Sequence, residues 1–258
     1  MFNKKSNKYV LLATTATLAA TAAIAPLASA QAVQDEVIVT TQRRAQNIQD
    51  VPVAVTAISG DLLEETGAVD ISAIQRLTPN ATVEVARGSN STLIAFIRGV
   101  GQQDPLWGFE PGVGMYVDDV YIARPQGSLL DVFDVERIEV LRGPQGTLYG
   151  RNTIGGAIKY VTKSLNMDSP ELAAQVNVGS HGQFDQIVKG SIPLGDTIAI
   201  GGAIANYKRD GFGTNLNTGA EHYDKDLFAA RVSAEWQPSE SFNLRIAYDN
   251  TNDKSNAK

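Results

Sequence analysis

The sequence predicts a small α+β domain followed by antiparallel strands of a transmembrane β-barrel, a fold class that rests on three observations. The chain opens with an export signal, continues with short helices and strands, and ends with long strands that have one apolar and one polar face. We expect four parts: a signal peptide over residues 1–30, a flexible linker over residues 31–50, the α+β domain over residues 51–165 and barrel strands over residues 166–258.

Residues 1–30 have the composition of a cleaved signal peptide. Three lysines and no acid precede an apolar run, and Ala28-Ser29-Ala30 forms a small-x-small cleavage signal. A transmembrane anchor is the alternative, because the apolar run is about long enough to span a bilayer. The threonines in the run, Pro26 and the cleavage signal favour export.

Net charge and cysteine content exclude several classes of partner and site. The formal net charge is −6, and loss of the three signal-peptide lysines leaves −9. Such an acidic chain is unsuited to nucleic acid, which needs a basic face. The absence of cysteine excludes a disulfide framework, a thiolate metal site and a cysteine nucleophile. The two histidines, His181 and His222, lie far apart, so we expect no protein-held metal and no cofactor.

Residues 51–165 alternate between strand and helix patterns. A strand is expected in VPVAVTAI, a short helix in DLLEET, and a second helix in ISAIQRL, for which Asp70 is a suitable N-cap. Further strands are expected in TLIAFIRG, GVGMYV, VYIAR, VERIEVLRG and GAIKYVTK. Asp118 and Asp119 stand between two of these runs, where a two-residue hairpin turn belongs.

No pattern in the chain indicates an enzyme, and we expect no catalytic residue. Adjacent strand residues point to opposite faces, so a hairpin turn explains Asp118-Asp119 better than a catalytic carboxylate pair does. The stretch from Glu139 to Lys163 is rich in glycine but lacks the G-x-x-x-x-G-K-[ST] pattern of a phosphate loop. Neither a dinucleotide fingerprint nor a G-x-S-x-G elbow occurs. We interpret these glycines as turn residues.

The last part of the chain contains long strands in which apolar and polar residues alternate. One face of the two clearest strands holds Phe228, Ala230, Val232, Ala234, Trp236, Phe242, Leu244, Ile246 and Tyr248, and the other holds Arg231, Ser233, Glu235, Asn243, Arg245 and Asp249. Spans of about ten residues with aromatics near the ends of the apolar face are typical of transmembrane barrel strands. A soluble β-sandwich is the alternative, but its strands are usually about five to six residues long.

The number of these strands is too small for a closed barrel. Residues 166–258 hold about five strands, whereas outer-membrane barrels have at least about eight and those with a filled lumen about twenty-two. Open strand edges are excluded from lipid because each unpaired backbone group there costs several kcal/mol. We therefore expect the N-terminal part of a longer protein with a 22-stranded barrel, or an interrupted gene product.

Four motifs in this order resemble the TonB-dependent outer-membrane receptors. They are DEVIVTTQRR, VPVAVTAISGDLLEETGAVDISAIQRLTPN, the pair AFIRGVG and MYVDDVYIAR, and VERIEVLRGPQGTLYGRNTIGGAIKYVTK. The resemblance implies a TonB box within residues 31–50 and a plug domain over residues 51–165. It also implies a Gram-negative outer-membrane location, with the plug facing the periplasm and the barrel lumen and the strands facing lipid.

The first motif contains a short run of high β-propensity in a polar segment. Such a segment can add as a strand to the edge of a partner's sheet. The resemblance implies that this partner is the periplasmic C-terminal domain of TonB, and that the TonB-binding residues are Glu36, Val37, Ile38, Val39 and Thr40. The alternative is an ordinary first strand of the plug.

The resemblance also implies residues that hold the plug in the barrel and residues that meet the extracellular ligand. The plug–barrel lock is expected at Arg98, Glu139 and Arg142. Ligand-binding candidates on two loops are Gln102, Gln103, Asp104, Trp107, Phe109 and Arg124. The expected activity is energised uptake of a scarce nutrient, with a metal chelate of the ferric siderophore type favoured over cobalamin or glycans. A passive or structural outer-membrane barrel and an exported soluble binding module are the competing functions.

Overall fold

The computed structural model describes residues 37–104, 106, 108–131 and 133–256. The expected signal peptide, Glu36 and Trp107 lie outside the described residues.

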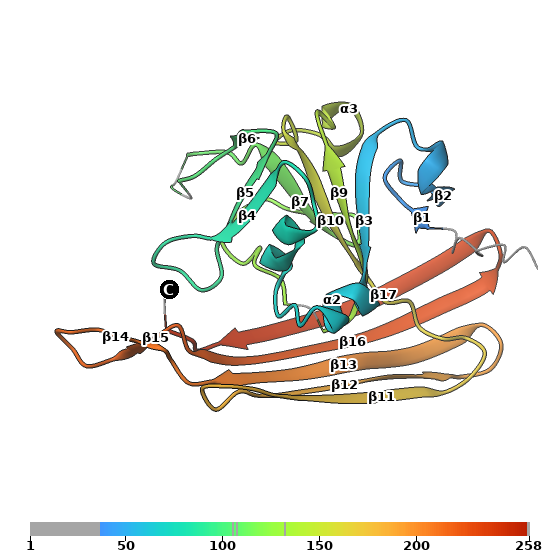
Figure 1. The fold of residues 1–258 in the computed structure, drawn as a ribbon. Coiled ribbons are helices and arrows are strands. Elements are labelled where there is room, and N and C mark those ends of the chain that lie inside the picture. The colour runs from blue at the N-terminus through green and yellow to red at the C-terminus, as the bar shows by residue number, and fades with distance from the viewer. Residues whose placement is uncertain (1–36, 105, 107, 132, 257–258) are drawn as a thin grey trace, which may run out of the picture. The chain divides into compact units, whose positions relative to one another are not determined.

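The plug region is built on a five-stranded mixed sheet (Figure 1). The strands lie in the order β3 (Ala54–Ser59), β9 (Val135–Arg142), β10 (Gly156–Thr162), β7 (Val113–Val117) and β8 (Val120–Ile122). Neighbouring strands are antiparallel except for β7 and β10, which are parallel. The strong β-propensity of these valine- and isoleucine-rich runs agrees with the predicted strands.

One face of this sheet packs into the main hydrophobic core. The elements that cover it are α2 (Gly60–Glu65), the 3-10 helix η2 (Ile71–Arg76) and a smaller antiparallel sheet of β4 (Ala81–Val85), β5 (Leu93–Ile97) and β6 (Val100–Gly101). Leu63 of α2, Ile74 of η2 and Val83 of β4 are fully buried against Ile138 and Ile158 of the main sheet. The apolar residues that the alternating pattern places on this face thus form the core.

The predicted helix cap at Asp70 and the predicted hairpin turn are confirmed, and the structure adds a cap at Ser59 that was not predicted. The Ser59 hydroxyl accepts a hydrogen bond from the amide of Leu62 at the start of α2, and Asp70 caps η2 by accepting from the amide of Ser72. Asp118 and Asp119 have φ angles of 44° and 68° and connect β7 to β8. Two consecutive residues with positive φ are the geometry of a two-residue hairpin turn, so the predicted turn is confirmed.

The opposite face of the main sheet is covered by the segment that precedes it. This segment consists of the pair β1 (Ile38–Val39) and β2 (Gln46–Asn47) and the 3-10 helix η1 (Ile48–Asp50). The helix α3 (Gly146–Tyr149) lies in the loop between β9 and β10 and supplies Tyr149 to a small cluster on this face with Tyr116, Leu141 and Ala157.

The final part of the chain is one antiparallel sheet whose strands follow chain order (Figure 1). The strands are β11 (Glu171–Val178), β12 (Phe184–Pro193), β13 (Ile198–Arg209), β16 (Lys225–Ser239) and β17 (Phe242–Asp253). A short hairpin of β14 (Gly213–Thr214) and β15 (Glu221–His222) lies in the long connection from β13 to β16. The other connections between these strands are short.

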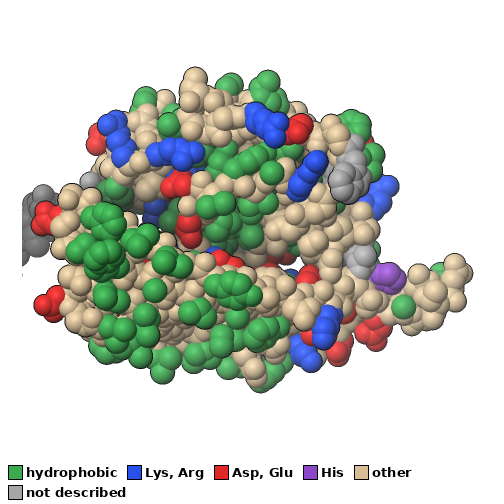
Figure 2. All heavy atoms as spheres, turned by 180° about the vertical axis from the view of Figure 1, so that it is seen from behind, with side chains coloured by type: hydrophobic (Ala, Val, Ile, Leu, Met, Phe, Trp, Pro, Cys, Tyr) green, Lys and Arg blue, Asp and Glu red, His purple; other side chains and the backbone are tan. Residues whose placement is uncertain are grey.

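The polarity of this sheet is the reverse of that of a soluble protein. The predicted apolar face is exposed, with Val232 64% and Ile246 65% accessible, whereas Arg231, Ser233 and Glu235 on the other face are buried. Hydrophobic side chains gather over the surface that these strands form (Figure 2). A soluble sandwich would bury the apolar face instead, so the transmembrane strand prediction is confirmed and the sandwich alternative is wrong.

None of the helices in the described ranges is long and apolar enough to cross a membrane.

The glycine-rich stretch forms the link between β9 and β10. Gly156 begins β10 with a φ angle of +152°, and a Cβ added there would lie 2.2 Å from the carbonyl oxygen of Leu141. This distance is far shorter than van der Waals contact, so the close approach of β10 to β9 requires a residue without a side chain.

We predict that Gly156→Ala destabilises the plug by about 2–4 kcal/mol, because the added methyl group overlaps backbone atoms of a neighbouring strand. Gly146→Ala is the matched control, since a Cβ at Gly146 meets no atom within 4 Å. Calorimetric unfolding of the full-length receptor in detergent measures both variants. Equal melting temperatures for the two variants would contradict the steric explanation.

Candidate functional site

A buried group of charged residues lies on the face of the main sheet that turns away from the core. Glu139 on β9 stands directly opposite Lys159 on β10 in the strand register. Their sequence neighbours Ile138 and Ile158 belong to the core, so strand alternation places both charges on the other face. Glu139 is 0% and Lys159 1% exposed. Two buried charges of opposite sign require hydrogen-bond partners to offset their loss of hydration.

The N-terminal segment supplies these partners through one residue, Thr40. The amide and hydroxyl of Thr40 donate hydrogen bonds to Oε1 of Glu139 over 2.8 and 3.1 Å. Nζ of Lys159 donates to the carbonyl oxygen and the hydroxyl of Thr40 over 3.0 and 2.8 Å. Arg137 donates to the same Glu139 oxygen over 2.8 Å, and Asp119 pairs with Lys159 over 3.0 Å. We call Thr40, Asp119, Arg137, Glu139 and Lys159 the Thr40 cluster.

Tyr149 fixes the residue that follows Thr40. Its hydroxyl donates to the carbonyl oxygen of Thr41 over 2.7 Å, and the hydroxyl of Tyr116 donates to the carbonyl oxygen of Tyr149 over 2.6 Å. The guanidinium of Arg43 lies 5.3 Å from the centre of the Tyr149 ring. Burial, followed by the charge of Glu139, raises the pKa of Tyr149 well above its ordinary value, so its hydroxyl stays a donor at neutral pH. The N-terminal segment is therefore docked on the plug by polar contacts.

The predicted TonB-binding residues in this docked segment differ in their exposure to solvent. Val37 and Ile38 are exposed, whereas Val39 is fully buried and pairs with Gln46. Thr40 carries the contacts to the main sheet. The segment thus combines a partly accessible β-strand with a polar attachment point.

A second set of contacts joins the plug to the barrel sheet. Asp131 pairs with Lys225 of β16 over 3.0 Å, and Asp134 pairs with Arg231 of the same strand over 3.6 Å. Phe133, between these acids, packs on the inner face of the sheet against Leu227 and its neighbours. A third ion pair joins Glu64 of α2 to Lys189 of β12 over 2.6 Å.

Burial perturbs the two acids of this contact. Loss of hydration raises the pKa of Asp131 and of Asp134, although the charges of Lys225 and Arg231 act in the opposite direction. The contact between the plug and the barrel sheet therefore combines the apolar side chain of Phe133 with carboxylates whose charged form is costly to bury.

The residues predicted to lock the plug in the barrel are not brought together by the structure. Glu139 hydrogen-bonds to Thr40 and Arg137, and a lock role for it stays a prediction. Glu139 and Arg142 are three residues apart on β9, so they point to opposite faces of the sheet. Arg98 is exposed in the turn after β5, with its guanidinium over Gly143. A lock role for Arg98 and Arg142 stays a prediction.

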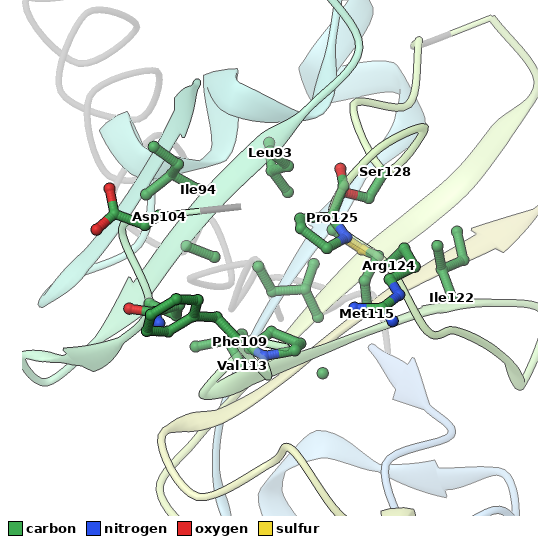
Figure 3. A pocket seen from close by; sticks show the side chains of 15 residues that line it. Leu93, Ile94, Asp104, Phe109, Val113, Met115, Ile122, Arg124, Pro125 and Ser128 are labelled. Carbon is green, nitrogen blue, oxygen red and sulfur yellow. The ribbon is translucent and has the colours of Figure 1, made fainter. Parts of the chain in front are cut away.

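Four of the predicted ligand-binding residues line one small cavity (Figure 3). Gln102, Asp104, Phe109 and Arg124 surround it together with apolar residues of β5, β7 and β8. Its volume of about 40 Å³ holds a few waters rather than a nutrient molecule. Gln103 is exposed outside the lining, and Trp107 lies outside the described residues.

A larger cavity of about 750 Å³ lies between the plug and the barrel sheet. Its lining includes Asp118 and Val120 of the plug and Lys225, Arg231 and Arg245 of the barrel sheet. This volume falls in the range of sites that hold small molecules, roughly 300–1,000 Å³. No group of three or more metal-ligating side chains occurs in the part of the chain that the structure describes.

Comparison with known proteins agrees with this fold. Residues 47–157 match the family model described as the TonB-dependent Receptor Plug Domain. The vitamin B12 transporter BtuB of Vibrio vulnificus strain CMCP6 is 33% identical over 141 residues, which cover 52% of this chain and 22% of the transporter. The pesticin receptor of Yersinia pestis is 29% identical over 185 residues, which cover 70% of this chain and 26% of the receptor.

The crystal structure of the ferric yersiniabactin uptake receptor FyuA from Yersinia pestis has the same fold. It superimposes with a TM-score of 0.69 at 24% sequence identity, covering 77% of this chain and 31% of that receptor.

A plug domain joined to lipid-facing antiparallel strands defines a class of outer-membrane proteins, the plugged barrels. Within that class, residues 47–157 form the plug domain of a TonB-dependent receptor, the family of outer-membrane proteins to which the chain belongs. The sequence resemblance and the predicted fold class are confirmed. The chain spans about a quarter of the length of the curated relatives that it matches, 22% of one and 26% of another.

We predict that the stabilising effect of Asp131 is lost as the pH rises. Its pKa is raised from the ordinary value of 3.8, so the folded protein binds more protons than the unfolded chain between the two pKa values. The contribution is therefore fully present below about pH 3.8 and is lost as the pH rises through the folded-state pKa. The melting temperature of Asp131→Asn should therefore rise relative to that of the natural protein as the pH rises from 3.5 to 7.

Calorimetry of the full-length receptor in detergent measures this relative change. Asp196→Asn, in an exposed turn of the barrel sheet, is the control for a surface carboxylate. A constant difference between Asp131→Asn and the natural protein over the whole pH range would contradict the prediction.

Proposed function

We propose that this chain forms the plug and first barrel strands of a transporter that imports a scarce nutrient with energy supplied through TonB. In this proposal residues 36–40 are the TonB box. The domain division at residues 30, 50 and 165 is part of the same proposal.

The observation that carries this proposal is the docking of the N-terminal segment through Thr40. The segment is attached by hydrogen bonds to Glu139 and Lys159, and only Val39 of the described box residues is deeply buried. Hydrogen bonds to charged groups contribute roughly 1.5–3 kcal/mol each, and water can replace them once the segment leaves and uncovers the two charges. A docked strand held in this way is suited to reversible release, whereas a strand in the hydrophobic core is not.

Release of the N-terminal segment exposes a free strand, which a partner that binds by adding a strand to its own sheet requires. Val37 and Ile38 are exposed and have high β-propensity, so the freed segment can pair with the edge of the TonB C-terminal domain through main-chain hydrogen bonds. A pull on that strand acts on the plug through the short link to β3, the edge strand of its main sheet. The polar and ionic contact between plug and wall permits the plug to rearrange while the barrel sheet stays in place.

The proposed substrate is a ferric siderophore. Support comes from the names of similar proteins, which include a ferric yersiniabactin uptake receptor and ferric-catecholate import receptors. Phe109 and Arg124, half-exposed and exposed at the small cavity, offer an aromatic surface and a cation to a bulky anionic chelate. Cobalamin is the alternative substrate, because the similar BtuB protein is a vitamin B12 transporter, and glycans are a further one.

Deleting residues 36–40 from the full-length receptor tests the proposal. We predict that uptake of ⁵⁵Fe-labelled siderophores falls to the level of a strain that lacks TonB, while binding of the same chelates to the cell surface is kept. Deleting residues 31–35, a segment of equal length, is the matched control and should leave uptake unchanged.

The outcomes separate the candidate functions. Uptake that survives deletion of residues 36–40 would indicate a passive or structural barrel. Loss of ⁵⁷Co-cobalamin uptake, with no TonB-dependent uptake of any siderophore in the panel, would replace iron by the alternative substrate.

A further inference from the structure

The hairpin of β7 and β8 touches both the cavities and the Thr40 cluster. Met115 of β7 and Ile122 of β8 pair across the hairpin, and both line the small cavity. Val117, Asp118 and Val120 at its turn line the large cavity. Asp119 in the same turn pairs with Lys159. The hairpin is therefore in contact with the spaces that a ligand would enter and with the group that holds the N-terminal segment.

The two acids of the turn have different partners. Asp118 accepts hydrogen bonds from the amide and hydroxyl of Thr162 over 2.8 and 2.6 Å, which ties the turn to the end of β10. Asp119 reaches the opposite face of the sheet and pairs with Lys159 over 3.0 Å. Asp118 thus holds the position of the turn, and Asp119 makes its contact with the Thr40 cluster.

β8 is the most weakly held strand of the main sheet. It lies at the edge, contains three residues and pairs only with β7. Arg124, two residues beyond its end, lines the small cavity together with Ile122 (Figure 3). Since that cavity holds only about 40 Å³, a ligand group that enters it must displace its lining, and an edge strand with few hydrogen bonds is the easiest part to move.

Movement of the turn changes the partners of Lys159. The ammonium group has three hydrogens, and it contacts the carbonyl oxygen of Thr40, the hydroxyl of Thr40 and the carboxylate of Asp119. If Asp119 withdraws, the buried charge needs another anion. Glu139 stands directly opposite on β9. If the side chain of Lys159 rotates toward Glu139, Thr40 loses the hydrogen bonds that it accepts from Lys159 and those that it donates to Glu139.

We propose that Asp119 is a positioning residue that couples the cavity side of the plug to release of the TonB box, by holding Lys159 on Thr40 until the β7–β8 hairpin moves. This inference rests on the proposed function. It identifies the Asp119–Lys159 contact as the one that transmits ligand occupancy to the TonB box. It also gives the Asp118-Asp119 turn a functional role as well as a structural one.

Asp119→Asn in the full-length receptor tests the coupling. Asparagine tolerates positive φ as aspartate does, so the turn is kept while the charge is lost. Without ligand, the isolated C-terminal domain of TonB should bind this variant about three- to fivefold more tightly than it binds the natural receptor, the range expected for loss of a half-exposed ion pair. Asp118→Asn is the matched control, because it removes the neighbouring charge while the asparagine side chain can keep both hydrogen bonds to Thr162 and so the position of the turn.

A spin label at Val37, introduced as Val37→Cys, gives a second readout that does not depend on TonB. The mobile fraction of the label should rise in Asp119→Asn and not in Asp118→Asn. Equal TonB affinity and equal label mobility in the natural receptor and Asp119→Asn would overturn the coupling and leave the proposed function intact. Equal effects of both variants would also overturn it, since a general disturbance of the turn would then explain the result. Failure of TonB to bind any of the receptors would overturn the proposed function and the coupling together.

Discussion

The opposed charges of Glu139 and Lys159 set a constraint on the rest of the plug. Both side chains are withdrawn from water at the centre of a sheet, and their hydrogen bonds reach Thr40 of the N-terminal segment and Arg137. Burial of an unpaired charge costs several kcal/mol, so the face they occupy requires a polar cover. Thr40, Arg137 and Asp119 provide it. The N-terminal segment therefore supplies hydrogen-bond partners that Glu139 and Lys159 need. When the segment leaves, other groups must form hydrogen bonds with these two charges.

The same logic of polarity governs the barrel sheet. Its lipid-facing side carries the apolar residues, so the side that faces the plug is left with Lys225, Arg231 and Glu235. A plug that meets such a wall can attach only through complementary charges and a limited apolar contact, which Phe133 supplies with its acidic neighbours. The composition of the plug's surface thus follows from the environment outside the barrel. The plug and the barrel strands are therefore complementary in charge across the inner face of the barrel sheet, which separates the plug from lipid.

Periodicity predicted the fold well and the site poorly. Alternation in the final strands gave the correct faces for Val232 and Arg231, and turn chemistry gave the hairpin at Asp118-Asp119, because both are local properties. β4 was not predicted although Ala81–Val85 alternates between apolar and polar residues, because the segment holds only five residues. The Thr40 cluster joins residues about a hundred positions apart, which no local pattern encodes. A signal was present in GAIKYV, where a lysine interrupts an apolar strand next to the strand that carries Glu139.

The two large contacts of the barrel sheet respond to different properties of their surroundings. Its outer face is held by apolar area, which is nearly insensitive to dissolved ions. On the inner face, the plug–barrel pair Glu64–Lys189 keeps part of both side chains accessible, so mobile ions weaken it over a Debye length of about 8–10 Å. The ionic strength of the periplasm therefore acts on the seating of the plug and leaves the seating of the barrel in the membrane unchanged.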